Sequence, residues 1–212
     1  GPKVPEAVHS ALPPGPGALD IAARQLTLDG NFRFDRASSA LEQQAARGGA
    51  VAISAAKIEI SDAATPATDA LHLSSTQLNA LGADTLTLGA LRTATDGGGH
   101  RLEVGAAEVL VSSTAQPLQA QDLVLVATDR VTLADGVRIA AVSGTTPSQG
   151  LSVEGDGALV RVSGDAAAAS VRTGAARALG QAELGAGVEL HGASLTIEST
   201  AGTRIADSAQ LD

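Results

Sequence analysis

Pairs of aliphatic residues separated by one small or polar residue recur along the whole 212-residue chain. In the stretch "GALDIAARQLTLDG", Leu19 and Ile21 form one such pair, and Leu26 and Leu28 form the next. Residues two positions apart point to the same face of a β-strand, so each pair predicts a short strand with one buried face. A strand this short is not stable alone, and it must therefore pair with other strands of the chain.

Six further segments repeat this pattern, and the second pair begins seven to nine residues after the first. Small residues such as Ser74-Ser75 lie between the two pairs, where they permit a tight bend. The pairs are Val51/Ile53 with Ile58/Ile60, Leu71/Leu73 with Leu78/Leu81, Leu102/Val104 with Val109/Val111, Leu123/Leu125 with Val131/Leu133, Leu151/Val153 with Val160/Val162, and Val188/Leu190 with Leu195/Ile197. Weaker pairs are Leu86/Leu88, Val137/Ile139, and Val171 with Leu179.

The shortest distances between the starts of successive segments are 20 and 21 residues. A repeat of this length with two or three short strands predicts a parallel β-solenoid, in which each coil pairs with the next about 4.8 Å away. The aliphatic pairs are then expected to stack in register around a narrow axis. The chain has no Trp, Tyr or Met and only two Phe, which suits a narrow and regular core. A β-sandwich or barrel is the alternative, although it normally has longer strands and core aromatics.

One segment, "SSALEQQAARGG", departs from the strand pattern. Ser39 and Glu42 have the spacing of a capping box, and good helix formers follow up to a pair of glycines. We therefore expect a short helix over Ala40–Arg47, inserted near residues 39–48. The only aromatic residues, Phe32 and Phe34, precede it; they either seal the core near this helix or the end of the rod, or form a small exposed recognition patch.

Three segments, "GALDIAARQLTLDG", "HRLEVGAAEVLVSST" and "GVELHGASLTIEST", resemble rungs of filamentous-haemagglutinin-like exoproteins. These are large surface proteins of Gram-negative bacteria that are exported by two-partner secretion. The resemblance extends over about residues 18–212 and implies a right-handed parallel β-helix, secretion to the bacterial cell surface, and a role in adhesion or contact-dependent antagonism. The family's secretion-domain motif "NPNG" does not occur, so the chain is expected to come from the body of such a protein.

The first residues are expected to lie outside the repeat. Gly1 and Pro2 are typical of what remains after an affinity tag is removed, and the Pro-rich stretch that follows predicts a linker. We therefore divide the chain into a tag remnant and linker over 1–17 and a β-helix segment over 18–212, and expect it to be a piece of a longer protein.

Charge and composition exclude several classes of function. A net charge of −9 disfavours nucleic acid as a partner, because nucleic-acid-binding proteins carry basic patches. The chain has no Cys, which excludes disulfides and thiolate metal sites. No apolar run is long enough for a membrane-spanning helix, so no membrane insertion is expected.

The four histidines are far apart in sequence and lack the spacing of metal ligands. We expect His9, His72, His100 and His191 to be solvated surface residues. The glycine-rich stretches "DGGGH" (Asp96–His100) and "EGDGA" (Glu154–Ala158) resemble calcium-binding repeats, but such repeats must occur in tandem. Both stretches are therefore expected to be loops between coils, and no metal or cofactor site is predicted.

An enzyme on a solenoid scaffold would place acidic and basic side chains together on one face. The candidates are Asp122, Asp129, Arg130, Asp135 and Arg138, which lie on adjacent predicted strands. General acid–base catalysis needs two positioned groups with separated pKa values, and no spacing here singles out such a pair. No catalytic residue is predicted, and the chain is not expected to be an enzyme.

The expected function is therefore structural presentation and adhesion, with an outer-membrane two-partner-secretion transporter, flanking solenoid coils and an unknown receptor on a host or neighbouring cell as partners. Loops that leave the rod are the expected binding segments: Arg33–Gly49, Ala90–Gly99 and Ser143–Gly150. A polysaccharide-cleaving enzyme, a self-assembling scaffold and a carrier for a toxin domain are the alternatives.

Overall fold

The computed structural model describes residues 25–27, 49–63, 69–144, 147–166 and 169–212. In this part of the chain nearly all regular structure is β-strand, with a single α-helix, so the prediction of an all-β fold is confirmed. Residues 1–17, the expected helix at 40–47, and Phe32 and Phe34 lie outside the described residues.

The strands form four sheets, which we label A to D. Sheet A contains, in spatial order, β1 (Gln25–Thr27), β2 (Ala50–Ser54), β5 (Thr85–Leu88), β10 (Asp122–Ala127), β14 (Ala158–Ser163) and β18 (Ser194–Ser199). Sheet B contains β4 (Leu71–Leu73), β3 (Lys57–Ile60), β8 (Glu108–Val111), β11 (Arg130–Leu133), β16 (Gln181–Leu184) and β19 (Gly202–Ile205). Sheet C contains β6 (Ala90–Ala94), β7 (His100–Val104), β13 (Leu151–Glu154) and β15 (Ser170–Thr173). Sheet D contains β9 (Leu118–Ala120), β12 (Arg138–Ala141), β17 (Glu189–His191) and β20 (Gln210–Leu211).

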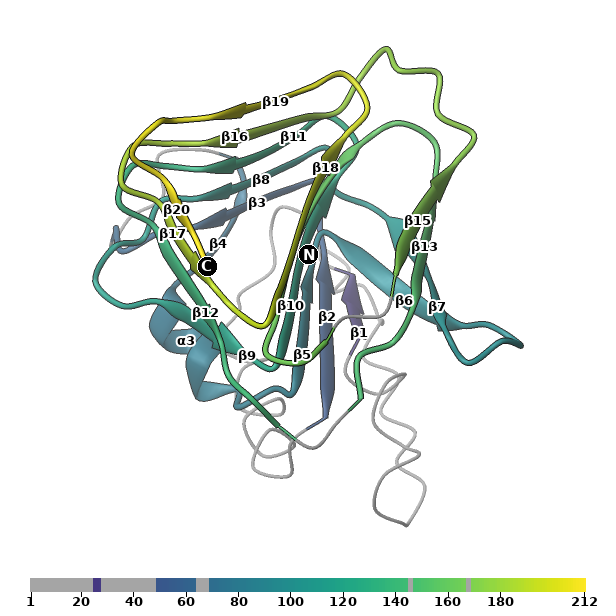
Figure 1. Ribbon diagram of the computed structural model, residues 1–212, viewed down its shortest axis with the longest axis horizontal. Helices are drawn as coiled ribbons and strands as arrows, with labels where there is room; N and C mark the ends of the chain where they lie inside the picture. The colour runs from purple at the N-terminus through teal and green to yellow at the C-terminus, as the bar shows by residue number, and fades with distance from the viewer. Residues whose placement is uncertain (1–24, 28–48, 64–68, 145–146, 167–168) are drawn as a thin grey trace, which may run out of the picture.

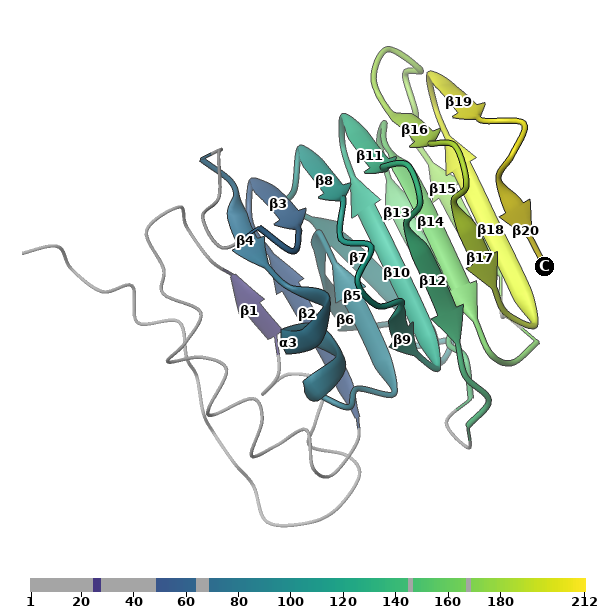
Figure 2. The ribbon, with the colours of Figure 1, turned by 90° about the vertical axis from the view of Figure 1, so that its left-hand side faces the viewer.

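Sheets A, B and D lie on three sides of one interior, and sheet C lies outside sheet A (Figure 1). The chain visits sheets A, B and D in turn through β10, β11 and β12, and again through β18, β19 and β20. Strands of each sheet therefore follow one another along a common direction (Figure 2). This arrangement brings residues that are far apart in sequence into adjacent positions.

Most of the described aliphatic pairs stack in register around the interior, as the sequence predicts, while Leu19, Ile21 and Leu28 lie outside the described residues. In sheet A, Ile53, Leu88, Leu125, Val160 and Ile197 occupy neighbouring positions on successive strands. The first four are fully buried in one continuous core, and a buried side chain of this size contributes about 1.5–3 kcal/mol. The matching row in sheet B is Ile60, Val111, Leu133, Leu184 and Ile205.

Pairing is not uniformly parallel, which corrects the prediction of a single parallel solenoid. Sheets B and D are parallel throughout their described strands, but β14 is antiparallel to both β10 and β18, and β6 is antiparallel to β7. After β12, the chain runs through β13 on the outside of sheet A before it forms β14 (Figure 2). Strand β14 therefore begins at the end of sheet A where its neighbours β10 and β18 finish, and it runs in the opposite direction.

Sheet C creates a second apolar layer that the sequence analysis did not anticipate. Leu102 and Val104 of β7 and Leu151 and Val153 of β13 pack there rather than around the main interior. Their partners on the outer face of sheet A are Val124, Val126 and Leu159. Because both faces of β10 are covered, all six of its residues are buried. The expected pair of Val171 and Leu179 is wrong, since both are about half exposed at 53% and 52%.

The only described helix, α3 (Ser75–Ala80), replaces the corner and the strand expected around Leu78 and Leu81. Ser74 caps its N-terminus, because its hydroxyl accepts a hydrogen bond from the Gln77 backbone N–H at 3.1 Å while Gln77 Oε1 accepts from the Ser74 N–H at 3.0 Å. Leu78 and Leu81 are still buried, because residues three apart share one face of a helix. Only the type of element differs from the prediction.

Replacing Ser74 with alanine is expected to lower the free energy of unfolding by about 0.5–2 kcal/mol, because the cap is lost. Urea denaturation measures this change. Ser74→Asp, which keeps an N-cap acceptor, is the matched control and is expected to remain close to the native protein. Equal stability of the alanine variant and the native protein would show that this cap does not hold α3.

Candidate functional site

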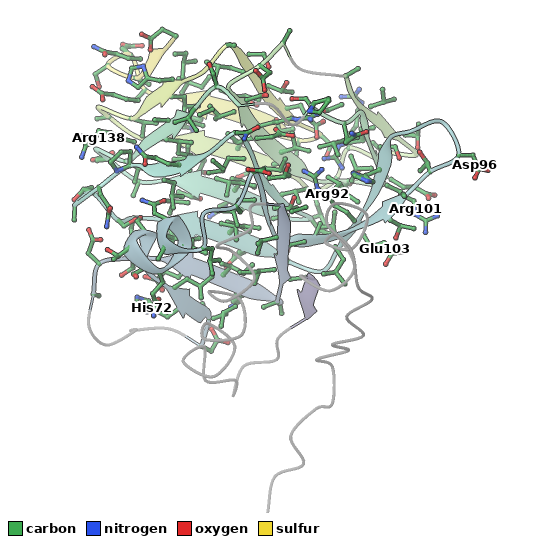
Figure 3. The ribbon with its side chains drawn as sticks, turned by 90° about the horizontal axis from the view of Figure 1, so that it is seen from below. His72, Arg92, Asp96, Arg101, Glu103 and Arg138 are labelled. Carbon is green, nitrogen blue, oxygen red and sulfur yellow. The ribbon has the colours of Figure 1, made fainter. Side chains whose placement is uncertain are left out.

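A β-hairpin made of β6 and β7 extends from the body of the molecule, and Asp96 lies at its tip (Figure 3). Its loop contains three consecutive glycines, and Gly98 adopts a positive φ of 84° that most other residues disfavour. The loop is closed by the Thr95 N–H and the Thr95 hydroxyl, which both donate to the Gly99 carbonyl at 2.8 and 3.0 Å. Around Gly97 and Gly98 no atom lies within 4 Å of the Cβ position, so their backbone is open to solvent.

A pocket of about 500 Å³ lies between this loop and the segment that leads into β13. Its lining combines parts of two of the loops that were predicted to bind, Ala90–Gly99 and Ser143–Gly150, with the start of β15. The third, Arg33–Gly49, lies outside the described residues apart from Gly49. The lining residues are Thr95, Gly97, Gly98, Gly99, His100, Ser148, Gln149, Gly150, Leu151, Ser152, Ala169 and Val171.

Backbone contact joins the two sides of this pocket. The His100 N–H donates to the Gly150 carbonyl at 2.8 Å, and His100 and Leu151 are paired in register between β7 and β13. A Cβ on Gly99 would lie 2.8 Å from the Gly150 oxygen, so this close approach requires glycine. The two segments meet because both flank sheet C, although some 50 residues separate them in sequence.

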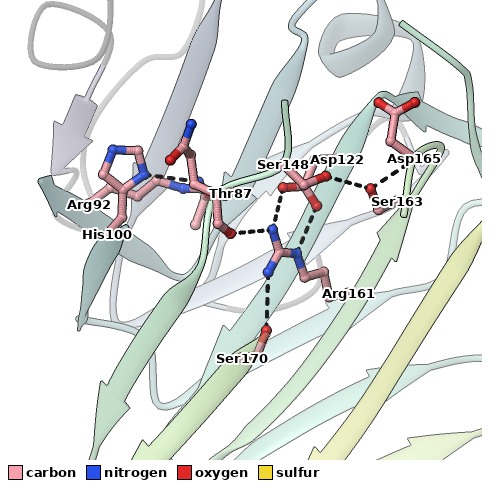
Figure 4. Close-up of polar contacts among 10 residues, drawn as sticks. Thr87, Arg92, His100, Asp122, Ser148, Arg161, Ser163, Asp165 and Ser170 are labelled. Atoms are coloured by element: carbon pink, nitrogen blue, oxygen red, sulfur yellow. Dashed lines mark hydrogen bonds and ion pairs between the residues drawn. The ribbon is translucent and has the colours of Figure 1, made fainter. Parts of the chain in front are cut away.

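His100 lies on the buried side of the pocket, which corrects the expectation of a solvated residue. It is 7% exposed, and its Nδ1 lies 3.4 Å from a guanidinium nitrogen of Arg92. Arg92 is also buried and donates from Nε to the Thr87 hydroxyl at 2.8 Å (Figure 4). Burial, and then the neighbouring Arg92, lower the pKa of His100 below its ordinary value of 6.5, so the imidazole is neutral at pH 7.

Burial is also the main reason that the pKa of Arg92 falls to about 10. The Asp122 carboxylate raises this pKa and the Arg161 guanidinium lowers it, both to a smaller extent than burial. Arg92 therefore remains a cation at neutral pH. Arg92, Asp122 and Arg161 thus interact electrostatically with one another in the layer between sheets A and C.

A buried ion pair holds the other wall of the pocket. Arg161 of β14 donates to both carboxylate oxygens of Asp122 on β10, from Nε at 2.9 Å and from a terminal nitrogen at 2.8 Å. Both side chains are at most 5% exposed. The same guanidinium donates to the Gln149 carbonyl at 2.7 Å and to the Ser170 hydroxyl at 3.2 Å (Figure 4). Arg161 therefore joins sheet A to the pocket segment and to β15.

A second hydrogen bond fixes the same segment, because the hydroxyls of Ser148 and Ser163 are 2.9 Å apart. On β15, Arg172 donates from Nε to the Glu198 carboxylate of β18 at 2.9 Å. These charged side chains thus bind other parts of the protein, whereas Asp96 and Arg101 of the β6–β7 hairpin are exposed.

The five acid–base candidates are not brought together. Asp122 binds Arg161, Asp129 accepts from the Thr128 hydroxyl at 2.9 Å, and Asp135 accepts from the Ala186 N–H at 2.8 Å. Each carboxylate therefore has a structural partner. Arg130 is exposed and donates to the Gln181 side chain at 3.3 Å, and Arg138 lies on the side of the molecule opposite the β6–β7 hairpin (Figure 3).

The remaining histidines and the second glycine-rich stretch have structural roles or surface positions. His191 is partly exposed, with Nδ1 2.6 Å from an Asp212 oxygen, as expected for a surface residue. His72 is half-buried in β4, so it is not the freely solvated residue that was predicted, and His9 lies outside the described residues. In the stretch Glu154–Ala158, the Asp156 carboxylate accepts backbone hydrogen bonds from residues 177–179, which lower its pKa.

Among the described residues, no group of three or more His, Asp or Glu side chains is arranged to hold a metal ion. No helix in the same part of the chain has the length and apolar character needed to cross a membrane. Comparison with known proteins found no matching family, no matching curated protein and no matching solved structure.

The lowered pKa of His100 predicts a specific pH dependence of stability. Below about pH 6.5 the unfolded chain binds a proton at this imidazole more readily than the folded protein does, so the folded state loses stability as the pH falls. Between pH 7.5 and pH 5.5 we expect the melting temperature of the native protein to fall more than that of His100→Gln, because glutamine does not titrate. Calorimetry of both proteins at the two pH values measures this difference in melting temperature. A difference that is the same at both pH values would contradict the lowered pKa of His100.

Proposed function

We propose that this chain is a structural and adhesive segment of a secreted bacterial surface protein, and that it binds its receptor through the pocket between the β6–β7 hairpin and β13. The observation that carries the proposal is the meeting of two remote loops around one pocket outside the ladder of strands. Loops held on a rigid scaffold are the usual place for binding residues. The three carboxylates considered as acid–base candidates, Asp122, Asp129 and Asp135, are each engaged in a structural contact.

The proposed architecture is a right-handed parallel β-helix that carries one reversed strand, β14, and an external sheet, sheet C. The recurring order of sheets A, B and D and the parallel pairing within sheets B and D support it. The direction of the turn supports right-handedness. In Figure 1 the chain turns anticlockwise from β18 to β19 and β20 as it comes towards the viewer, which is the path of a right-handed helix. Export by a two-partner-secretion transporter and flanking coils in a longer protein belong to the same proposal.

Binding of the fluorescently labelled chain to a panel of epithelial and bacterial cells tests the adhesive role. We expect saturable binding that Ser152→Trp abolishes, because Ser152 lines the pocket and a large ring fills the space. Gln119→Trp, at an exposed position on β9 of sheet D, is the matched control and should bind as the native chain does. Absence of saturable binding to every surface, or binding that Ser152→Trp leaves unchanged, would contradict the proposal.

A further inference from the structure

The sequence contains four Asp-Gly pairs, and three of them lie in the described residues: Asp96–Gly97, Asp135–Gly136 and Asp156–Gly157. The fourth, Asp29–Gly30, lies outside them. An aspartate carboxyl can close a five-membered ring with the nitrogen of the next residue, and glycine offers the least hindrance because it has no side chain. The closure needs a carboxyl group and a backbone N–H that are both free to move. The three described pairs differ in this respect.

Asp96 and Gly97 occupy the tip of the β6–β7 hairpin, where both are exposed (Figure 3). Among the described residues, neither the Asp96 carboxylate nor the Gly97 N–H has a hydrogen-bond partner. The loop is held at its flanks, since the Gly98 N–H donates to the Thr95 carbonyl at 3.1 Å and the Thr95 N–H donates to the Gly99 carbonyl at 2.8 Å. Rotation about the Asp96 Cα–C bond, which brings the two reacting atoms together, therefore disturbs the hydrogen bonds of this turn alone.

In the pair Asp135–Gly136, both reacting groups are bound to another coil. Asp135 Oδ1 accepts from the Ala186 N–H at 2.8 Å, and the Gly136 N–H donates to the Ala186 carbonyl at 2.9 Å. Asp135 is exposed to solvent in the same way as Asp96. The two pairs thus differ in their hydrogen bonds and not in the access of water, and ring closure at Asp135 would first have to break both bonds.

The pair Asp156–Gly157 is held by more hydrogen bonds. The Asp156 carboxylate accepts from the backbone N–H groups of residues 177–179 at 2.7 to 2.9 Å, and these bonds, that of Leu179 above all, lower its pKa. The Gly157 N–H is buried and donates to the Thr200 hydroxyl at 2.9 Å. Ring closure expels water and proceeds from the protonated carboxyl, so a lowered pKa slows it as well.

We propose that Asp96 is a site of spontaneous isoaspartate formation, at which the protein modifies the tip of its own hairpin. The Gly97 nitrogen attacks Cγ of Asp96, a C–N bond forms, and the carboxyl OH leaves with the nitrogen's proton as water. Water then opens this succinimide ring. Attack at Cγ breaks the new C–N bond and restores aspartate, whereas attack at the main-chain carbonyl breaks the original peptide bond and gives isoaspartate. The sum is an isomerisation, with water as the only co-reactant, and it does not depend on the proposed adhesive function.

Isomerisation adds one carbon to the main chain of the loop, because the path then runs through Cβ and Cγ of Asp96. The former main-chain carboxyl becomes a side group, so the net charge of the loop is unchanged. Gly97 and Gly98 line the pocket beside the hairpin, and their positions must shift. The pair Ala94 and His100, which ends the ladder between β6 and β7, lies outside the enlarged turn. The modification therefore changes the wall of the pocket and leaves sheet C in place.

Incubation of the folded protein for several weeks at pH 6 and 37 °C tests the proposal. Trypsin places the three described pairs in different peptides, and electron-transfer dissociation mass spectrometry distinguishes isoaspartate from aspartate by its backbone fragments. We expect at least about tenfold more isoaspartate at Asp96 than at Asp135 or Asp156, the rate ratio that corresponds to one hydrogen bond broken before ring closure. Equal isomerisation at the three sites, or none at Asp96, would overturn the proposal.

Two controls separate the effect of the fold from that of the local sequence. In guanidinium chloride no pair is held, and all three are expected to isomerise at similar rates. The same excess at Asp96 in the unfolded chain would assign the difference to the neighbouring residues and overturn the role of the fold. Asp96→Glu would need a six-membered ring and should give no isomer at this position in the folded protein; an isomer signal there would contradict ring closure through Asp96.

The ¹H–¹⁵N NMR spectrum of the incubated protein tests the structural consequence. We expect a second set of amide signals for residues 95–99, in proportion to the isoaspartate measured by mass spectrometry, and unchanged signals for β13 and β15. New signals throughout sheet C would contradict a change confined to the hairpin tip.

Discussion

Replacing Asp122 with alanine is expected to lower the free energy of unfolding by about 3–5 kcal/mol, the usual cost of breaking a buried ion pair. The guanidinium of Arg161 is 0% exposed and donates to both carboxylate oxygens of Asp122. Without the carboxylate, this cation stays buried beside Arg92, which already repels it. Urea denaturation followed by circular dichroism measures the loss.

Two controls separate charge from packing. The double variant Asp122→Leu with Arg161→Met replaces both charges by apolar side chains and is expected to be far less destabilised than Asp122→Ala, because no buried charge is left unpaired. Asp207→Ala removes an exposed carboxylate and should change stability by less than about 0.5 kcal/mol. A loss below about 1 kcal/mol for Asp122→Ala would mean that the pair is not buried as described.

Replacing Leu125 with alanine is expected to lower the free energy of unfolding by about 2–5 kcal/mol. Leu125 is fully buried between Leu88 of β5 and Val160 of β14, in the row that faces the main interior. Removing its side chain leaves a cavity that both neighbouring strands line. The core there is built from regular aliphatic rows, so little rearrangement is available to fill the space.

The matched control makes the same substitution at the edge of the ladder. Leu211 of β20 is 41% exposed, and Leu211→Ala is therefore expected to cost less than about 1 kcal/mol. Leu125→Met nearly conserves the side-chain volume and should lower the free energy of unfolding by less than about 1.5 kcal/mol. Chemical denaturation measures all three; a similar loss at Leu125 and Leu211 would contradict the register of sheet A.

Spacing alone predicted the buried rows of sheets A and B, because an aliphatic pair at a period of two has one buried face, but it wrongly assigned Leu102/Val104 and Leu151/Val153 to the same interior. It could not predict strand direction, since a strand read from the sequence has the same period whichever way it runs. The reversed β14 depends on the path of the chain outside sheet A. A signal for the second layer was nevertheless present: Leu123–Ala127 is a continuous apolar run, which is typical of a strand covered on both faces.

Two other features were present in the sequence but needed structural context. Arg161 interrupts the apolar run of β14, and a charged residue in such a run requires a buried partner; only the fold shows that Asp122 is that partner. Ser74 and Gln77 have the spacing of a capping box, so helix α3 could have been predicted. His100 follows a glycine loop, and its burial depends on sheet C, which no local pattern indicates.

The convergence of two remote loops at one pocket can be tested directly by pairing cysteines in a chain that has none. Arg101 of β7 and Ser152 of β13 are neighbours in register, a separation that suits a disulfide. Oxidation of the Arg101→Cys, Ser152→Cys variant, followed by peptide mass spectrometry, should show a nearly complete intramolecular disulfide, whereas Glu103→Cys with Ser152→Cys, two residues out of register, should show little. Equal cross-linking of the two pairs, or none in the first, would contradict the arrangement of sheet C on which the binding site depends.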